Sequence, residues 1–185
     1  MSIFNFDTEE EFKKLSSRVR DEIDYIQKRR LEFLLFQLQR CESPIEQLLL
    51  PHLLDAVNYL ITDHVSVPKF ENIRLLIQSE IPINNDKKYR LDFHIICDFE
   101  DKQHQFAIEC DGHDFHEKTK EQAKRDKQRD RNLQQLGFTV IRFTGSEIWA
   151  NPSKCANEVT EIIMKVVGFE DYWDRLVQED LYSTE

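Results

Sequence analysis

The pattern of apolar and polar positions divides the chain into helical and strand-like stretches. Apolar residues recur at three- and four-residue spacing over residues 21–40, which predicts a long amphipathic helix. A second helix is expected from Pro44 to about Ile61, because Ser43, Pro44 and Glu46 form a helix-start signature before a leucine-rich run. Further apolar runs predict strands over residues 73–83, 89–97, 106–111 and 138–143. Helices are expected over residues 117–136, ending at Gly137, and from Ser153 as N-cap to Val167.

The order of these elements predicts an α/β fold. The first three strands are close enough in sequence to pair as antiparallel hairpins, one of them turning at residues 98–103. The fourth strand must cross over by way of the helix at 117–136. We expect a mixed four-stranded sheet flanked by helices, with an extra long helix at the N-terminus. The corresponding organisation is an N-terminal helical extension over 1–42, a core domain over 43–167 and an acidic, aromatic tail over 168–185.

Composition adds four expectations about the class of protein. With 185 residues, 40% hydrophobic and 32% charged, the chain is typical of one globular domain with short additions. No apolar run approaches the roughly 18 residues of a membrane span, so we expect no membrane partner. The four cysteines are scattered, which favours reduced thiols and a cytoplasmic location over a disulfide framework. The formal net charge of −10 argues mildly against a nucleic-acid partner.

Three acidic residues lie on strands at places where apolar side chains dominate. Alternation puts Glu109 and Asp111 on one face of their strand, about 6–7 Å apart. If the strands at 89–97 and 106–111 pair antiparallel, Asp92 faces Glu109 at roughly 5 Å. Carboxylates this close raise one another's pKa unless a cation neutralises them. An oxygen-lined site for a divalent metal ion is the simplest interpretation, with Mg²⁺ as the first candidate.

The helix at 117–136 is unusually polar. Seven basic and four acidic residues lie between Glu117 and Arg131. At helical spacing the basic side chains form two neighbouring stripes, one with Lys120, Lys124, Lys127 and Arg131 and one with Lys118, Arg125 and Arg129. A basic face beside a carboxylate cluster suits a phosphodiesterase, in which the basic residues hold backbone phosphates. The alternative is a solvated helix with internal ion pairs, and charge alone favours neither.

Several motifs together resemble the PD-(D/E)XK nuclease superfamily, and more narrowly the group related to very-short-patch-repair endonucleases. The matching residues occur in the family's order: Ser43-Pro-Ile-Glu46, Asp92-Phe93, Glu109-Cys-Asp111-Gly112 with His116, Asp126-x-x-Arg129-Asp130-x-x-Leu133-x-x-x-Gly137 and Val140-x-Arg142-Phe143. The resemblance covers about residues 43–159 and implies a restriction-endonuclease-like core.

The resemblance also implies a function and roles for individual residues. The implied activity is Mg²⁺-dependent endonucleolytic cleavage of DNA, with Mn²⁺ as a substitute metal ion. Asp92, Glu109 and the main-chain carbonyl of Cys110 would bind the metal, and Glu46 would reach in from the first core helix. The chain departs from the family at two positions: Asp111 stands where a catalytic lysine is usual, and Glu80 where the relatives have glutamine. Asp111 would then be a further metal ligand, and His113, His116 or a basic side chain of the polar helix would replace the lysine.

Other interpretations stay open for these residues. Glu46 can be a capping-box residue, Arg142 a buried pair partner or a phosphate contact, and the His113-x-x-His116 pair with Cys110 a zinc site. The whole domain can be a catalytically inactive nuclease fold that binds nucleic acid or a protein. The helix at 21–40 is a candidate contact for a homodimer.

Overall fold

The computed structural model describes residues 8–62, 70–84, 87–112, 120–172 and 174–175. The chain divides into two compact units, residues 1–39 and residues 40–185. In the described residues no helix is long and apolar enough to cross a membrane.

The first unit is helical. Helix α1 spans Thr8–Lys14 and α2 spans Ser17–Leu38. Helix α2 begins earlier than expected because the side chain of Ser16 accepts a hydrogen bond from the Val19 amide and caps the helix. None of the residues of α2 is buried, although the long helix was expected to be amphipathic. A homodimer contact through α2 stays a prediction.

The second unit contains a mixed sheet of four strands in the order β1-β2-β3-β4. The strands are β1 Phe70–Asn84, β2 Lys87–Phe99, β3 Lys102–Asp111 and β4 Phe138–Thr144. The pairs β1–β2 and β2–β3 are antiparallel, whereas β3–β4 is parallel. The β2–β3 hairpin turns at Glu100 and Asp101, both with positive φ (47° and 60°), as a tight two-residue turn requires. The predicted topology is therefore confirmed.

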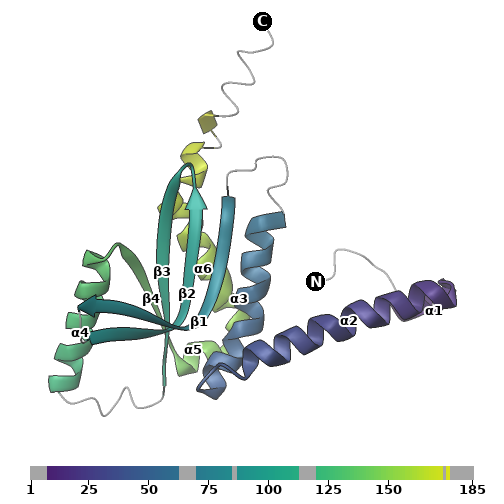
Figure 1. Cartoon of the computed structure of the whole chain (residues 1–185), viewed down its shortest axis with the longest axis horizontal. Helices are drawn as coiled ribbons and strands as arrows, with labels where there is room; N and C mark the ends of the chain where they lie inside the picture. The colour runs from purple at the N-terminus through teal and green to yellow at the C-terminus, as the bar shows by residue number, and fades with distance from the viewer. Residues whose placement is uncertain (1–7, 63–69, 85–86, 113–119, 173, 176–185) are drawn as a thin grey trace, which may run out of the picture. The chain divides into compact units, whose positions relative to one another are not determined.

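Four helices accompany this sheet: α3 Pro44–Thr62, α4 Lys120–Gln135, α5 Gly145–Ala150 and α6 Pro152–Val167. Figure 1 shows α4 on one side of the sheet and the α3–α6 pair on the other. Gly137, with φ at 85°, follows the C-terminal end of α4, as predicted. The expected N-cap of α6 was wrong: Asn151 caps the Lys154 amide, because Pro152 already occupies the first helical position.

The segment after α6 adds apolar contacts at the hairpin end of the sheet. The rings of Phe70 and Phe99 contact Phe169, and Phe99 also meets Tyr172 edge to face. Phe169 and Tyr172 are buried, so the start of the predicted aromatic tail packs on the sheet. The division at 168 was an expectation from sequence and stays a prediction.

A break in the β1–β2 ladder lies beside the candidate site. The register passes from Ile77↔Phe93 to Ser79↔Leu91 without a pair between Gln78 and Asp92, and Gln78 has φ at +52°. Figure 1 shows that both strands change direction part-way along their length. Regular alternation would place Leu91 and Phe93 on the same face of β2. That expectation is wrong, since Leu91 packs with Ala107 on one face whereas Phe93 pairs with Ile108 on the other. A non-glycine residue with positive φ costs about 1–3 kcal/mol and commonly occurs at functional sites.

Helix α4 is held to the sheet mainly by one apolar side chain. Leu133 is fully buried and belongs to a cluster with Leu91, Ala107 and Phe138. Among the α4 side chains that the structure describes, the others are half-buried or exposed. The position of α4 over β2 and β3 thus depends on Leu133 together with polar contacts.

We predict that Leu133→Ala lowers the free energy of unfolding by about 2–5 kcal/mol, because it leaves a cavity between α4 and the sheet. Leu136→Ala, at a side chain that is 45% exposed, should change it by less than about 1 kcal/mol. Urea denaturation followed by circular dichroism measures both. Equal effects of the two substitutions would contradict this packing.

Candidate functional site

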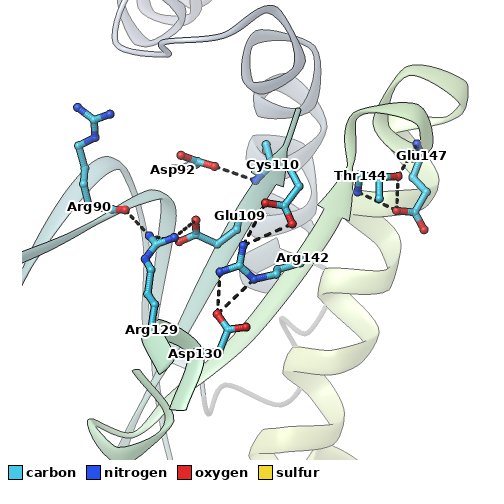
Figure 2. Close-up of polar contacts among 10 residues, drawn as sticks. Arg90, Asp92, Glu109, Cys110, Arg129, Asp130, Arg142, Thr144 and Glu147 are labelled. Carbon is cyan, nitrogen blue, oxygen red and sulfur yellow. Dashed lines mark hydrogen bonds and ion pairs between the residues drawn. The ribbon is translucent and has the colours of Figure 1, made fainter. Parts of the chain in front are cut away.

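Asp92 and Glu109 lie on adjacent antiparallel strands, as the sequence predicts. The β2–β3 register reaches Phe93↔Ile108, so these two acids are the next residues along each strand. Glu109 is 5% exposed and Asp92 is half-buried. Asp92 Oδ2 accepts a hydrogen bond of 2.7 Å from the Cys110 backbone amide (Figure 2). Two carboxylates are thereby brought to one place at the break in β2.

Burial and mutual repulsion make these carboxylates hard to ionise. Burial, with a smaller contribution from the nearby Asp92, raises the pKa of Glu109 to about 7 against the opposing effects of Arg129 and Arg142. Burial is also the main reason that the pKa of Asp92 is raised, and Glu46 and Asp111 add to the shift. Acids from α3, β2 and β3 therefore share one electrostatic environment.

Arg129 of α4 neutralises Glu109 through a bidentate ion pair. Its Nη1 donates to Glu109 Oε2 at 2.8 Å, and its Nη2 donates to Oε1 at 2.7 Å (Figure 2). Nη2 also donates to the Arg90 carbonyl oxygen, and the guanidinium carbon lies 5.7 Å from the centre of the Tyr89 ring. The Tyr89 hydroxyl in turn accepts a 2.7 Å hydrogen bond from Asn132. Arg129, expected on the nucleic-acid-binding stripe, is engaged inside the protein instead.

Asp111 is paired with a second arginine. Arg142 of β4 donates from Nη1 to the two oxygens of Asp111 at 3.1 and 3.4 Å. Its Nη2 and Nε donate to Asp130 Oδ1 of α4 at 2.7 and 3.2 Å (Figure 2). These contacts raise the pKa of Arg142. Arg142 had been interpreted either as a pair partner or as a phosphate contact, and the structure shows it as the pair partner of Asp111 and Asp130.

Glu46 makes one half of a capping box with Ser43, but its carboxylate accepts from the Glu42 amide rather than the Ser43 amide. Its Oε1 accepts from the Ser43 hydroxyl at 2.7 Å, and its Oε2 accepts from the Glu42 backbone amide at 2.9 Å. The Ser43 hydroxyl accepts from the Glu46 amide at 3.3 Å. Gln78 Nε2 donates to Glu46 Oε2 at 2.8 Å. Glu46 is 5% exposed, so these donors stabilise a buried carboxylate at the first turn of α3.

Gln78 is the residue that the sequence analysis missed. In the family resemblance, the position of the relatives' glutamine, two residues before Pro82–Ile83, is Glu80. Glu80 forms an exposed ion pair with Lys88. The break in β1 places the Gln78 amide against Glu46, and Gln78 Oε1 is buried without a hydrogen-bond partner among the described residues. A polar residue directly after the apolar run Leu75-Leu76-Ile77 was the available signal.

The oxygen atoms of these acids suit a hard divalent cation, but their arrangement does not yet form a site. Carboxylate and main-chain oxygens are the ligands that Mg²⁺ prefers. Among the described residues, however, no group of three or more His, Cys, Asp or Glu side chains is placed to hold a metal ion. Arg129 engages Glu109 and Arg142 engages Asp111. The donor chemistry fits Mg²⁺, whereas the partners of Glu109 and Asp111 are arginines.

The predictions for the cysteines fall on described residues, whereas those for His113 and His116 do not. All four cysteines are free thiols, as expected. Burial is the main reason that the pKa of Cys110 is raised, and nearby carboxylates add to it, so this thiol is neutral. His113, His116 and Lys118 lie outside the described residues.

The remaining basic residues of α4 face water. Lys120, Lys124, Arg125, Lys127 and Arg131 are exposed, and Arg131 donates to Gln128 of the same helix at 2.7 Å. Helix α4 therefore presents one half-buried arginine to Glu109 and five exposed cations to the outside. This arrangement places positive charge next to the clustered acids.

We predict that Arg142→Met lowers the free energy of unfolding by about 1–3 kcal/mol, because Asp111 and Asp130 lose charge-assisted hydrogen bonds in a half-buried site. Arg90→Met breaks an ion pair with Glu42 whose side chains are 53% and 52% exposed, so it should cost at most about 1 kcal/mol. Urea denaturation of both variants checks this difference. Equal costs would show that the Arg142 contacts contribute no more than a surface pair.

Comparison with known proteins gives one match. The family model REase_MTES_1575, which describes a restriction-endonuclease-like family, matches residues 74–163. The matched segment is slightly less than half of the chain and includes Asp92, Glu109, Asp111, Arg129 and Arg142. Searches of curated proteins and of solved structures give no significant match. Over this segment the chain is similar to a restriction-endonuclease-like family, and its mixed sheet flanked by helices is consistent with that fold.

Proposed function

We propose that this protein is a metal-dependent endonuclease that hydrolyses phosphodiester bonds of DNA. Within the restriction-endonuclease-like family, the order of its motifs favours the group related to very-short-patch-repair endonucleases. The family match makes a nuclease the first expectation. The substrate, the metal ion and the subgroup are our proposal.

One observation carries the proposal: acids from three elements share a neighbourhood inside a nuclease-like fold. Glu46 and Glu109 are each 5% exposed, and the charge of each raises the pKa of a neighbouring group in the site. Clustered buried carboxylates destabilise a protein unless a cation or a proton compensates them. Their presence in a fold that carries hydrolytic sites favours catalysis over a purely structural role.

Asp92 and Glu109 are the residues we propose as metal ligands, with the Cys110 carbonyl and Asp111 as further oxygen donors. Bound Mg²⁺, or Mn²⁺ in its place, would supply Lewis-acid stabilisation and an acidified water at the scissile phosphate. Glu46, held by Ser43 and Gln78, would place negative charge at the edge of this site. A cytoplasmic location is proposed on the basis of the free thiols.

Helix α4 is proposed to hold the DNA backbone. Its exposed cations Lys120, Lys124, Arg125, Lys127 and Arg131 can bind phosphates while Glu109 faces the scissile bond. Because Asp111 occupies the usual lysine position, one of the basic side chains or His116 would offset the charge that develops at the phosphate. For DNA binding, the positive charge gathered on α4 matters more than the formal net charge of −10 of the whole chain.

A second candidate is a catalytically inactive module that binds nucleic acid or a protein partner. The ion pairs Glu109–Arg129 and Asp111–Arg142 favour it, because they neutralise two of the acids without a metal ion. The cost of keeping Asp92, Glu46 and Glu109 close together argues against it. Cleavage assays separate the two candidates.

We predict Mg²⁺- or Mn²⁺-dependent cleavage of supercoiled plasmid or labelled single-stranded DNA, abolished by EDTA. Glu109→Gln should reduce the rate by about 100-fold or more, because loss of a ligand should cost at least as much as loss of an outer-shell partner. The measurement is the nicking or cleavage rate with each metal ion.

Asp98→Asn is the matched control for this experiment. Asp98 lies on the same strand as Asp92 but near the β2–β3 turn, where it contacts Gln103 and Asn72. This variant should cleave at the wild-type rate. DNA binding without cleavage under any condition would favour the inactive module, and cleavage that survives Glu109→Gln would refute the proposed site.

A further inference from the structure

We propose that Arg129 is a positioning residue that competes with the divalent cation for Glu109, so that metal binding requires Arg129 to release this carboxylate. The inference rests on the proposed function and adds a residue that controls when the site accepts its metal ion. It concerns an acid of the site whose two oxygens are bound by two different guanidinium nitrogens of one arginine.

The contacts of Arg129 show a guanidinium held on several sides. Glu109 accepts two hydrogen bonds at 2.7 and 2.8 Å, and the Arg90 carbonyl accepts another. The Tyr89 ring lies against the guanidinium, and Asn132 fixes the Tyr89 hydroxyl. A guanidinium fixed in this way needs little further ordering to bind a carboxylate bidentately. This pair is therefore a specific arrangement rather than a chance surface contact.

Burial distinguishes this ion pair from others in the same unit. The side chains of Arg129 and Glu109 are 22% and 6% exposed, whereas those of Arg90 and Glu42 are 53% and 52% exposed. In a half-buried pair the charges are screened less by water, so the attraction is stronger. Glu109 consequently has a cation in place before any metal ion arrives.

A metal ion and Arg129 cannot both bind Glu109 at full strength. The carboxylate has further lone pairs, but a divalent ion coordinated to it would lie a few ångströms from the guanidinium. Two cations at such a distance in a buried site repel each other. Binding of the metal ion must therefore weaken or break the contacts between Arg129 and Glu109.

This competition also accounts for the absence of a formed metal site among the described residues. Asp92 is bonded to the Cys110 amide, and Asp111 faces Arg142. With Glu109 turned to Arg129, the three carboxylates each have a separate partner (Figure 2). Release of Arg129 would make both oxygens of Glu109 accessible next to Asp92.

The test is the affinity of the full-length protein for Mn²⁺, measured by isothermal titration calorimetry. Arg129→Met keeps the length of the side chain but removes its charge and its hydrogen bonds. We expect it to bind Mn²⁺ about tenfold or more tightly than the wild type, since charge-assisted hydrogen bonds no longer compete. Arg175→Met, at an arginine that pairs with Glu100 near the β2–β3 turn, should bind like the wild type.

A second measurement uses the wild-type protein, so it does not depend on whether the variant folds. The guanidinium protons of Arg129 should exchange slowly with water in the metal-free protein, because they are bonded to Glu109 and to the Arg90 carbonyl. Addition of Mg²⁺ should accelerate their exchange or shift their NMR signals. The NMR signals of Arg175, which is bonded to Glu100 near the β2–β3 turn, supply an internal comparison.

The outcomes separate this inference from the proposed function. Equal or weaker Mn²⁺ binding by Arg129→Met, together with cleavage that depends on Glu109, would overturn the competition and leave the endonuclease standing. Absence of Mn²⁺ binding and of cleavage in both proteins would refute the proposed function and the inference with it. Arg129 signals unchanged by saturating Mg²⁺ would also overturn the competition.

Discussion

Glu109 brings a negative charge into the interior of the sheet, and the polar contacts around it follow from the need to balance that charge. Its side chain is 6% exposed and is bound by Arg129 of α4. The pair joins β3 to α4, and the Arg90 carbonyl adds β2 to the same contact. Because burial alone would drive Glu109 toward its protonated form, the cation on α4 is what allows the carboxylate to exist there.

The break in β1 and β2 places the polar side chains that lie near Glu109. At Gln78 the backbone enters the left-handed region, and no ladder pair joins Gln78 to Asp92. Gln78 can then bind Glu46, while Asp92 binds the Cys110 amide. The strained backbone and the buried acids occur at the same place, as expected when a fold gives up some stability for a chemical site. Leu133 secures α4 over this region and so keeps Arg129 within reach of Glu109.

Much of the fold was predictable from local patterns. Hydrophobic periodicity, the Ser43–Pro44–Glu46 start and Gly137 gave the helices and strands, and the chain order gave the mixed sheet. The proximity of Asp92 and Glu109 also followed, because antiparallel register is fixed by a short turn. The break at Gln78 was not predictable, since positive φ at a glutamine has no local signal in the sequence.

The partners of charged residues were harder to predict than their positions. Charge spacing on α4 suggested internal ion pairs, but the long side chain of Arg129 reaches Glu109, twenty residues away. Asp130 likewise pairs with Arg142 on β4. Local spacing identifies neighbours on one helix, whereas packing decides which buried acid an arginine meets. For the same reason, the motifs contained Arg129 and Arg142 but did not show which acids these arginines neutralise.

The central claim is that Asp92 and Glu109 form a divalent-metal site once Arg129 has withdrawn. The most direct measurement is the anomalous scattering of Mn²⁺ in crystals of the wild-type protein. The account predicts a peak within about 2.0–2.6 Å of oxygens from both Asp92 and Glu109, with the Arg129 guanidinium moved away from Glu109. A peak elsewhere, or an intact Arg129–Glu109 pair with no peak at saturating Mn²⁺, would contradict it.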